Sequence, residues 1–381
     1  MGKFLTSRWY RRRSPRIVAG VLFFLALIAA ACWPAMPRWL YSAAESGNVR
    51  AARIILTIRP GLVNAWLERP EPQQEPHSGW LRRSDAKRIL VYVHCLGVAV
   101  ENDQLRMVEF LLSHGAGPNL PQFVWGPHTG YAALHFAHNA PMAELLLRYG
   151  ADPNHAESDG TTPLFPIQDW IQRTQRVDWP PLDVAQVLLA RGADLSRRDI
   201  YGATPLHIAC ATDHTGRYVG LLLENGADVM SRNKHGSTPL HYFRLEGPDG
   251  ASALAHMLAA GAELDARDGK GLTPLHYAAR ASKTGSVKLL LEAGAQPSLE
   301  DDEGHTALYH AARWRNGGGV IRLLLAAQAG WPETGAQLQE VLALARETAV
   351  TDPQYDLAII LMLEAAIAAQ VSAGHTPAQG Q

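Results

Sequence analysis

A short motif that recurs along most of the chain limits the possible folds more than any other feature. Thr-Pro-Leu-His begins at Thr204, Thr238 and Thr273, and Thr162 begins a shortened copy. Variants begin at positions 132 and 306, so that successive starts lie 30, 42, 34, 35 and 33 residues apart. This period is typical of a solenoid, in which each unit covers the apolar face of the next.

A second motif follows each copy of the first. Leu-Leu-Leu at 145–147, 221–223 and 289–291 leads into Gly-Ala, and 188–194 has a similar form. In the first motif, Thr can cap a helix, and Pro fits its first turn, where a missing N–H costs nothing. Leu followed by two small residues forms a narrow apolar stripe, and Gly suits a helix C-cap. The sequence therefore predicts pairs of short helices.

These two motifs, repeated in phase, resemble the ankyrin repeat family. Weaker copies at 40–56 and 96–116 extend the resemblance toward the N-terminus, and 342–363 resembles a degenerate ninth unit. The resemblance implies an all-α solenoid of eight repeats plus a C-terminal cap, built from helix-turn-helix units with short β-hairpin loops. We expect this domain to span residues 38–370 and residues 371–381 to form a disordered tail.

Two insertions interrupt the repeat period, at 68–80 and 171–181. Both contain Pro and lack periodicity, which indicates loops. They are either tolerated surface insertions, because long loops cost little extra entropy, or loops that contact a partner. Trp80 and Trp179 make the second interpretation as plausible as the first.

The first 37 residues have the pattern of a membrane anchor. Six Lys and Arg residues lie within residues 1–16 without an acidic residue, and no charged residue follows between positions 17 and 37. A helix over 17–37 would span roughly 30 Å, the thickness of the bilayer core. Trp9, Trp33 and Trp39 flank it as interfacial aromatic residues do. The basic flank predicts a cytoplasmic N-terminus and an exported solenoid.

Alternatives to an uncleaved anchor are a buried core helix, a signal peptide cleaved near 29–31, and a lipoprotein signal that ends at Cys32. The length and the one-sided charge disfavour a core helix, and Trp33-Pro34 is a poor neighbour for either cleavage. We therefore expect a single-pass protein of the cytoplasmic (inner) membrane. The solenoid would then lie in the periplasm or otherwise outside the cytoplasm.

Composition excludes several classes of protein. The 381 residues have a net charge of −1, which becomes −7 once the six positive charges of the N-terminal segment are removed. A nucleic-acid-binding domain would show a basic excess, and three Cys are too few for a disulfide scaffold. No Cys-x-x-Cys, His-Glu-x-x-His, nucleophile elbow or phosphate loop occurs. We expect no enzyme activity, cofactor, metal or small-molecule substrate.

Histidine and cysteine have structural interpretations in this sequence. His135, His207, His241 and His276 share one repeat position. Copies one repeat apart lie about 10 Å from each other, too far to share a metal. The family resemblance implies that this His bonds backbone near the turn. The remaining His residues look scattered singly, and Cys95 and Cys210 are expected to be buried in helices.

The resemblance also indicates where a partner would bind. In ankyrin arrays the hairpin tips and the inner face of the first helices form the concave surface. The corresponding positions here are the residues just before Thr-Pro and those seven and eight beyond Thr. They are Tyr131, Asp169, Trp170, Ile200, Tyr201, Lys234, His235, Lys270, Leu272, Arg280, Asp302, Glu303, His305, Arg313 and Trp314. Several are Trp, Tyr or Arg, which are enriched at interface hot spots.

We therefore predict a non-catalytic scaffold that binds a protein partner outside the cytoplasmic membrane. An immunity or antitoxin-type protein and a factor that assists an exported enzyme both fit this interpretation. The alternative from another class is a structural envelope component that organises membrane complexes.

Overall fold

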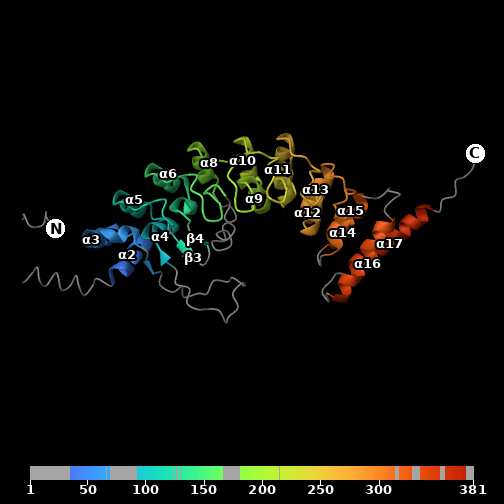
Figure 1. Ribbon diagram of the computed structural model, residues 1–381, viewed down its shortest axis with the longest axis horizontal. Coiled ribbons are helices and arrows are strands. Elements are labelled where there is room, and N and C mark those ends of the chain that lie inside the picture. Colours follow the sequence, from blue (N-terminus) through green and yellow to red (C-terminus); the bar gives the residue numbers. More distant parts are fainter. Residues whose placement is uncertain are drawn as a thin grey trace, which may run out of the picture. The chain divides into compact units, whose positions relative to one another are not determined.

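The computed structural model describes residues 35–65, 67–68, 92–121, 123–125, 128–129, 131–165, 181–213, 215–313, 317–327, 335–351 and 357–374. Two compact units divide the chain between Asp152 and Pro153. Within each unit, short helices follow one another in chain order (Figure 1).

The first unit contains helices from three repeats and one small sheet. Its helices are α2 (Met36–Glu45), α3 (Val49–Ile58), η4 (Pro60–Asn64), α4 (Cys95–Glu101), α5 (Leu105–Ser113), η5 (Ala133–Phe136) and α6 (Ala140–Arg148). Its strands are β1 (Leu67–Glu68), β2 (Tyr92–Val93), β3 (Phe123–Trp125) and β4 (His128–Thr129). The strands pair antiparallel in chain order, with Leu67 opposite Val93, Val93 opposite Phe123 and Val124 opposite Thr129. The predicted β-hairpin loops thus extend into a four-stranded sheet here.

The second unit is helical over nearly all of its regular structure. Its helices are α8 (Leu182–Ala190), α9 (Pro205–Thr212), α10 (Arg217–Glu224), η6 (Pro239–Tyr242), α11 (Gly247–Ala259), α12 (Pro274–Arg280), α13 (Thr284–Glu292), α14 (Ala307–Ala312), α15 (Gly318–Ala327), α16 (Gly335–Thr351) and α17 (Ala358–Gly374). An isolated bridge joins Glu300 to Thr306. The prediction of stacked helix pairs is confirmed.

The Thr-Pro motif begins its helices as its chemistry predicts. Thr204, Thr238 and Thr273 are N-caps, each with Pro in the first turn and a capping box completed by the His three residues later. Behind the cap, Leu206 and the small pair Ala209-Cys210 are buried. These small side chains let the neighbouring helix approach closely, which creates the apolar stack between repeats.

Two of the predicted first helices are shorter than expected. η5 and η6 are single 3₁₀ turns, whereas α9 and α12 are α-helices at the same repeat position. In η6, Phe243 stands where α9 has Ala209, and its backbone leaves the helix at φ −62° and ψ 113°. Its side chain is only 2% exposed.

Asparagine side chains connect successive repeats near the Gly-Ala turns. Asn64 Nδ2 donates to the carbonyl of Gly115 (2.9 Å), and its Oδ1 accepts from Gly117 N (2.9 Å). Asn119 makes the equivalent pair of bonds to Gly150 and Asp152, and Asn154 makes it to Gly192 and Asp194. Because one amide satisfies both a carbonyl and an N–H of the next repeat, it sets the spacing between neighbouring turns.

The predicted membrane segment lies outside the described residues except at its end. α2 begins at Met36, so the final residues of the 17–37 segment belong to the first repeat. Within the described part of the chain, no helix is sufficiently long and apolar to cross a membrane. Most of the two predicted insertions at 68–80 and 171–181 also lies outside the described residues.

The degenerate ninth unit is a pair of long helices, α16 and α17, each of 17 residues. Leu338, Val341 and Leu342 of α16 are buried, as are Ile359 and Leu363 of α17. α17 continues from Val371 to Gly374, past the boundary at which the sequence analysis places a disordered tail. The later residues of that predicted tail are outside the described part.

Candidate protein-binding surface

Four loops of the second unit, at 199–203, 233–237, 268–272 and 301–305, are closed by the same side-chain geometry; we call them the tip loops. Asp199 Oδ1 accepts hydrogen bonds from Tyr201 N (2.9 Å) and Ala203 N (2.8 Å). Asn233, Asp268 and Asp301 each accept the corresponding pair of backbone bonds. Asx side chains commonly close turns in this way, so each tip loop is rigid before any partner binds.

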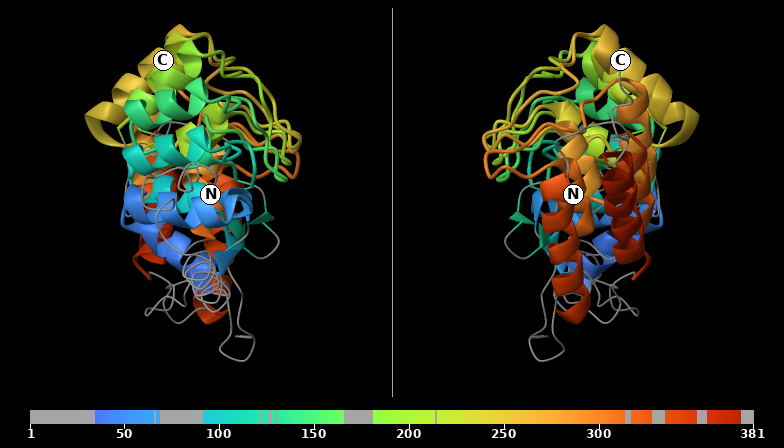
Figure 2. Two further views of the ribbon diagram at one scale, coloured as in Figure 1. Left: turned by 90° about the vertical axis from the view of Figure 1, so that its left-hand side faces the viewer. Right: turned by 90° about the vertical axis from the view of Figure 1, so that its right-hand side faces the viewer.

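The tip loops are joined to one another by main-chain hydrogen bonds. Ile200 N donates to Asp159 O (2.7 Å), Lys234 N to Tyr201 O (3.0 Å), Gly269 N to His235 O (2.8 Å) and Asp302 N to Lys270 O (3.0 Å). The loops of this unit project together on one side of the helices (Figure 2). They form a continuous ledge, which we call the tip row.

Three arginines one repeat apart support the tip row. Arg198 Nη1 donates to Gly202 O (2.9 Å) in its own loop and to Arg232 O (2.8 Å) in the next repeat. Arg232 repeats this geometry with Gly236 O and Arg267 O, both at 2.7 Å. Arg267 lies 3.4 Å from an Asp302 carboxylate oxygen. The sequence analysis missed these residues, although their spacing at the repeat interval was visible.

The shared His residues lie beneath the tip row and bridge repeats. Thr204 N donates to His207 Nδ1 (3.1 Å), so the proton sits on Nε2, which donates to Ser237 O (3.0 Å). His241 and His276 make the same bonds, to Leu272 O and His305 O. Burial lowers the pKa of His207 to about 4 and lowers that of His241. The predicted structural role is confirmed for these three residues; His135, the fourth, is buried in η5 of the first unit.

Most of the predicted binding residues in the second unit lie along the tip row. Ile200 and Tyr201 are 50% and 61% exposed, so both present large apolar surface to solvent. Further residues of the row that are exposed are Lys234, His235, Lys270, Asp302 and Glu303, and His305 is partly exposed. The structure thus brings together residues that are more than a hundred positions apart in the chain.

Other predicted binding residues lie elsewhere. Leu272 is only 7% exposed, so its assignment to the surface is wrong: its side chain faces the core at the base of a tip loop. Tyr131, in the first unit, is partly exposed and packs edge-on against His135 and Phe136.

Arg280 and Arg313 are exposed at the C-terminal ends of α12 and α14, away from the tip loops. Asp169, Trp170 and Trp314 lie outside the described residues.

Models of three related families match this chain. A model of three ankyrin repeat copies matches residues 246–330, one of many copies matches 188–243, and one of a single repeat matches 129–158. The chain is an ankyrin repeat protein. Comparison with curated proteins finds no relative that matches it. The helix pairs before residue 129 and after residue 330 lie beyond the matched segments.

Ankyrin repeat arrays act as scaffolds for protein–protein interaction, and they are typically non-catalytic. The thiols of Cys95 and Cys210 are too deeply buried to act as nucleophiles. Cys95 and Cys210 are free and buried, as predicted. Burial raises the pKa of Cys95 to about 12 and raises that of Cys210 still further above its usual range. Both thiols therefore stay protonated and behave as small apolar side chains.

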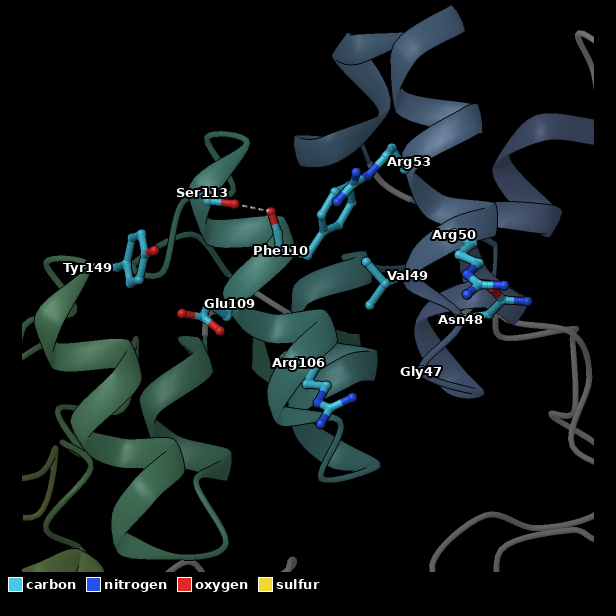
Figure 3. A pocket seen from close by; sticks show the side chains of 10 residues that line it. All are labelled: Gly47, Asn48, Val49, Arg50, Arg53, Arg106, Glu109, Phe110, Ser113 and Tyr149. Carbon is cyan, nitrogen blue, oxygen red and sulfur yellow. Dashed lines mark hydrogen bonds between the residues drawn. The ribbon is translucent and has the colours of Figure 1, made fainter.

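A groove of the first ankyrin unit lies between α3 and α5 (Figure 3). Arg50, Arg53 and Arg106 line it, and the Arg53 guanidinium lies 5.7 Å from the centroid of the Phe110 ring. Tyr149 and Glu109 complete one end. The sequence analysis missed this groove because its residues come from the second helices of their repeats, outside the surface implied by the family.

The structure also brings together Asp301, His305 and His310, whose potential metal-binding atoms lie within 4.8 Å of one another. The interpretation that the remaining His residues are scattered singly is therefore wrong for His305 and His310. A signal was present in the sequence, because these residues are four and nine positions beyond Asp301. It was overlooked because the spacing matches no familiar motif.

Proposed function

We propose that this ankyrin repeat protein binds a protein partner along the tip row and has no catalytic role of its own. One observation carries the proposal: Ile200 and Tyr201 are half or more exposed on a ledge whose main chain is already fixed by hydrogen bonds. A preorganised surface loses little entropy when it binds, and exposed aromatic residues are frequent interface anchors.

The side chains along the tip row indicate the chemistry of the partner. Ile200 and Tyr201 supply an apolar end, Lys234 and Lys270 follow with positive charge, and Asp302 and Glu303 supply negative charge at the other end. A complementary partner surface would place an apolar pocket beside acidic groups and then basic ones. Such ordered charge fixes the register of a complex more than it raises its affinity.

We further propose that the array is displayed outside the cytoplasmic membrane, in a bacterial periplasm, with residues 17–37 as its anchor. The six positive charges before this uncharged segment support the proposal, since cationic flanks stay in the cytoplasm. Under this proposal the partner is an exported protein, such as a toxin that the array neutralises or an enzyme that it assists.

The binding proposal is tested by affinity capture from membranes of the source organism with the full chain, followed by quantitative binding of the captured protein. We expect Tyr201→Ala to weaken binding by about 30-fold, the effect of losing a hot spot of about 2 kcal/mol. Lys234→Glu should weaken binding and make it less sensitive to added salt, because salt no longer screens an attraction at this position.

Tyr149→Ala is the matched control, because this exposed tyrosine caps the end of α6 in the first unit and belongs to none of the tip loops. It should leave binding unchanged, and circular dichroism should show the same helix content in every variant. If Tyr201→Ala and Lys234→Glu both bind the captured protein as tightly as the unmodified chain, the tip row is not the binding surface.

The anchor is tested separately by mass measurement of the mature chain and by protease treatment of spheroplasts. Retention of the N-terminal residues together with digestion of the array from outside supports the anchor. Loss of about 31 residues would show instead that the segment is a cleaved signal.

A further inference from the structure

The tip loop at 301–305 differs from the other three because two histidine side chains lie beside the carboxylate that closes it. His310 Nε2 lies 2.8 Å from Asp301 Oδ2, and His305 Nδ1 lies 3.9 Å from Asp301 Oδ1. Glu303 Oε2 is 3.5 Å from the same His305 nitrogen. His305 Nδ1 is buried and has no hydrogen-bond partner among the described residues. Two imidazoles and a carboxylate therefore converge on one small space.

The immediately preceding repeat has different residues at the positions of both histidines. Tyr277 occupies the position of His310, and its hydroxyl donates to Asp268 Oδ2 at 2.9 Å. Leu272 occupies the position of His305 and is buried. That repeat thus has a hydrogen-bond donor at one position and an apolar side chain at the other. The repeat from 301 to 312 has a metal-binding nitrogen at both.

We propose that Asp301, His305 and His310 bind one Zn²⁺ ion. Tetrahedral zinc with bonds of about 2.0–2.1 Å holds its ligand atoms about 3.4 Å apart. The three atoms here lie within 4.8 Å, so small side-chain rotations bring them to that spacing. Glu303, which is exposed, is placed to become a fourth ligand or to leave that position to water.

A carboxylate beyond the cluster suits the proposed metal site. Glu340 Oε1, on α16, lies 3.9 Å from His305 Nε2, the ring nitrogen that faces away from Asp301. A ligating histidine usually donates its other N–H to such a carboxylate, which sets its tautomer and strengthens its bond to the metal. His305 also stacks on Tyr309, with ring centroids 3.7 Å apart. Zinc would thus join a tip loop to α14 and, through His305 and Glu340, to α16.

The test is calorimetric titration of the tag-free full chain with Zn²⁺ after dialysis against a chelator. The variant His310→Tyr removes one ligand yet restores the residue that Tyr277 supplies in the preceding repeat, so the loop keeps its hydrogen bond to Asp301. His305→Leu restores the residue of Leu272 in the same way. We expect each to abolish one equivalent of zinc binding, and Glu340→Gln to weaken that binding by about tenfold or more.

His235→Ala removes an exposed histidine from a different tip loop and serves as the control, for which zinc binding should be unchanged. Co²⁺ in place of Zn²⁺ should give the visible spectrum of a four- or five-coordinate ion, and His310→Tyr should lose it. The proposal is overturned if the unmodified chain binds no zinc. It is equally overturned if His310→Tyr and His305→Leu bind the same number of ions with the same affinity, which would indicate adventitious surface binding.

Discussion

At the residue scale, the most informative side chain is the histidine of Thr-Pro-Leu-His. His207 accepts from the backbone of its own helix N-terminus and donates to Ser237 O in the next repeat. The bond accepted by Nδ1 requires the neutral ring, because a proton on Nδ1 would face the Thr204 N–H. This residue therefore caps a helix and links two repeats with a single imidazole, and it has no free nitrogen for catalysis.

Because the folded protein needs a neutral His207 ring, we expect its stability to fall in acid. His207 has a pKa of about 4 when folded and about 6.5 when unfolded, so the unfolded chain binds more protons between these values. Stability is full above about pH 6.5 and falls as the pH decreases toward 4. Arg198 and His241 also disfavour the protonated ring, while Asp228 partly offsets them. We expect protonation of His207 alone to reduce the free energy of unfolding by about 2 kcal/mol at pH 5 relative to pH 7.

Urea denaturation at pH 7 and pH 5, followed by circular dichroism, measures this loss. His207→Leu cannot titrate, so it should be less stable at pH 7 but should lose less stability on acidification. An equal loss in both chains would show that His207 is not responsible.

At the scale of the element, the turns of a repeat depend on glycine for two separate reasons. Gly236 has φ +77°, and a Cβ there would lie 2.8 Å from Gly269 N in the next loop. Gly226, which follows α10, has φ +88° but faces open space. The first position thus combines an unfavourable backbone conformation with a collision between repeats, whereas the second has only the backbone conformation.

Alanine substitution separates these two costs. Gly226→Ala should destabilise by about 1–2 kcal/mol, the cost of a left-handed residue with a Cβ. Gly236→Ala should cost clearly more, because the backbone of the adjoining tip loop must also move. Gly61→Ala, in η4, has neither problem and should change stability by less than about 1 kcal/mol. Thermal denaturation of the three variants checks this order, and equal losses at Gly226 and Gly236 would contradict it.

At the scale of the whole molecule, each ankyrin repeat of the second unit depends mainly on its neighbours. α11 packs against α10 and α13, whereas α16 packs against α14 and α17 at the C-terminal end. In such arrays stability is approximately the sum of repeat and interface energies, so damage spreads to adjacent repeats before it affects the rest.

Two matched leucine substitutions test this locality. Leu254 in α11 and Leu342 in α16 are buried, with exposures of 3% and 6%. Each change to Ala should cost about 2–4 kcal/mol in its own repeat. Hydrogen exchange should show that Leu342→Ala loosens α14–α17 and leaves α9 and α10 protected. Leu254→Ala should loosen helices on both of its sides. Uniform loss of protection throughout the unit in both variants would argue for one cooperative block instead.

The candidate surface was only partly predictable from sequence. Ile200, Tyr201, Lys234 and Lys270 follow from their position before the motif, because turn chemistry places that segment at a loop tip. Leu272 occupies a similar position and is nevertheless buried, because it ends the tip loop directly beside the buried N-cap Thr273. Trp170 and Trp314 stay predictions, as does the membrane anchor.

The sequence by itself determined the local structure: the Thr caps, the glycine turns, the helix pairs and the repeat interval. These features depend on hydrogen bonds and torsion angles within a few residues of each other, so a short segment of sequence is enough to predict them. Only the tertiary structure decided which groups of different repeats meet. The arginine bonds beneath the tip row join residues more than thirty positions apart, and Glu340 reaches His305 from another helix pair. Such contacts depend on how one repeat is rotated against the next, which no local motif encodes.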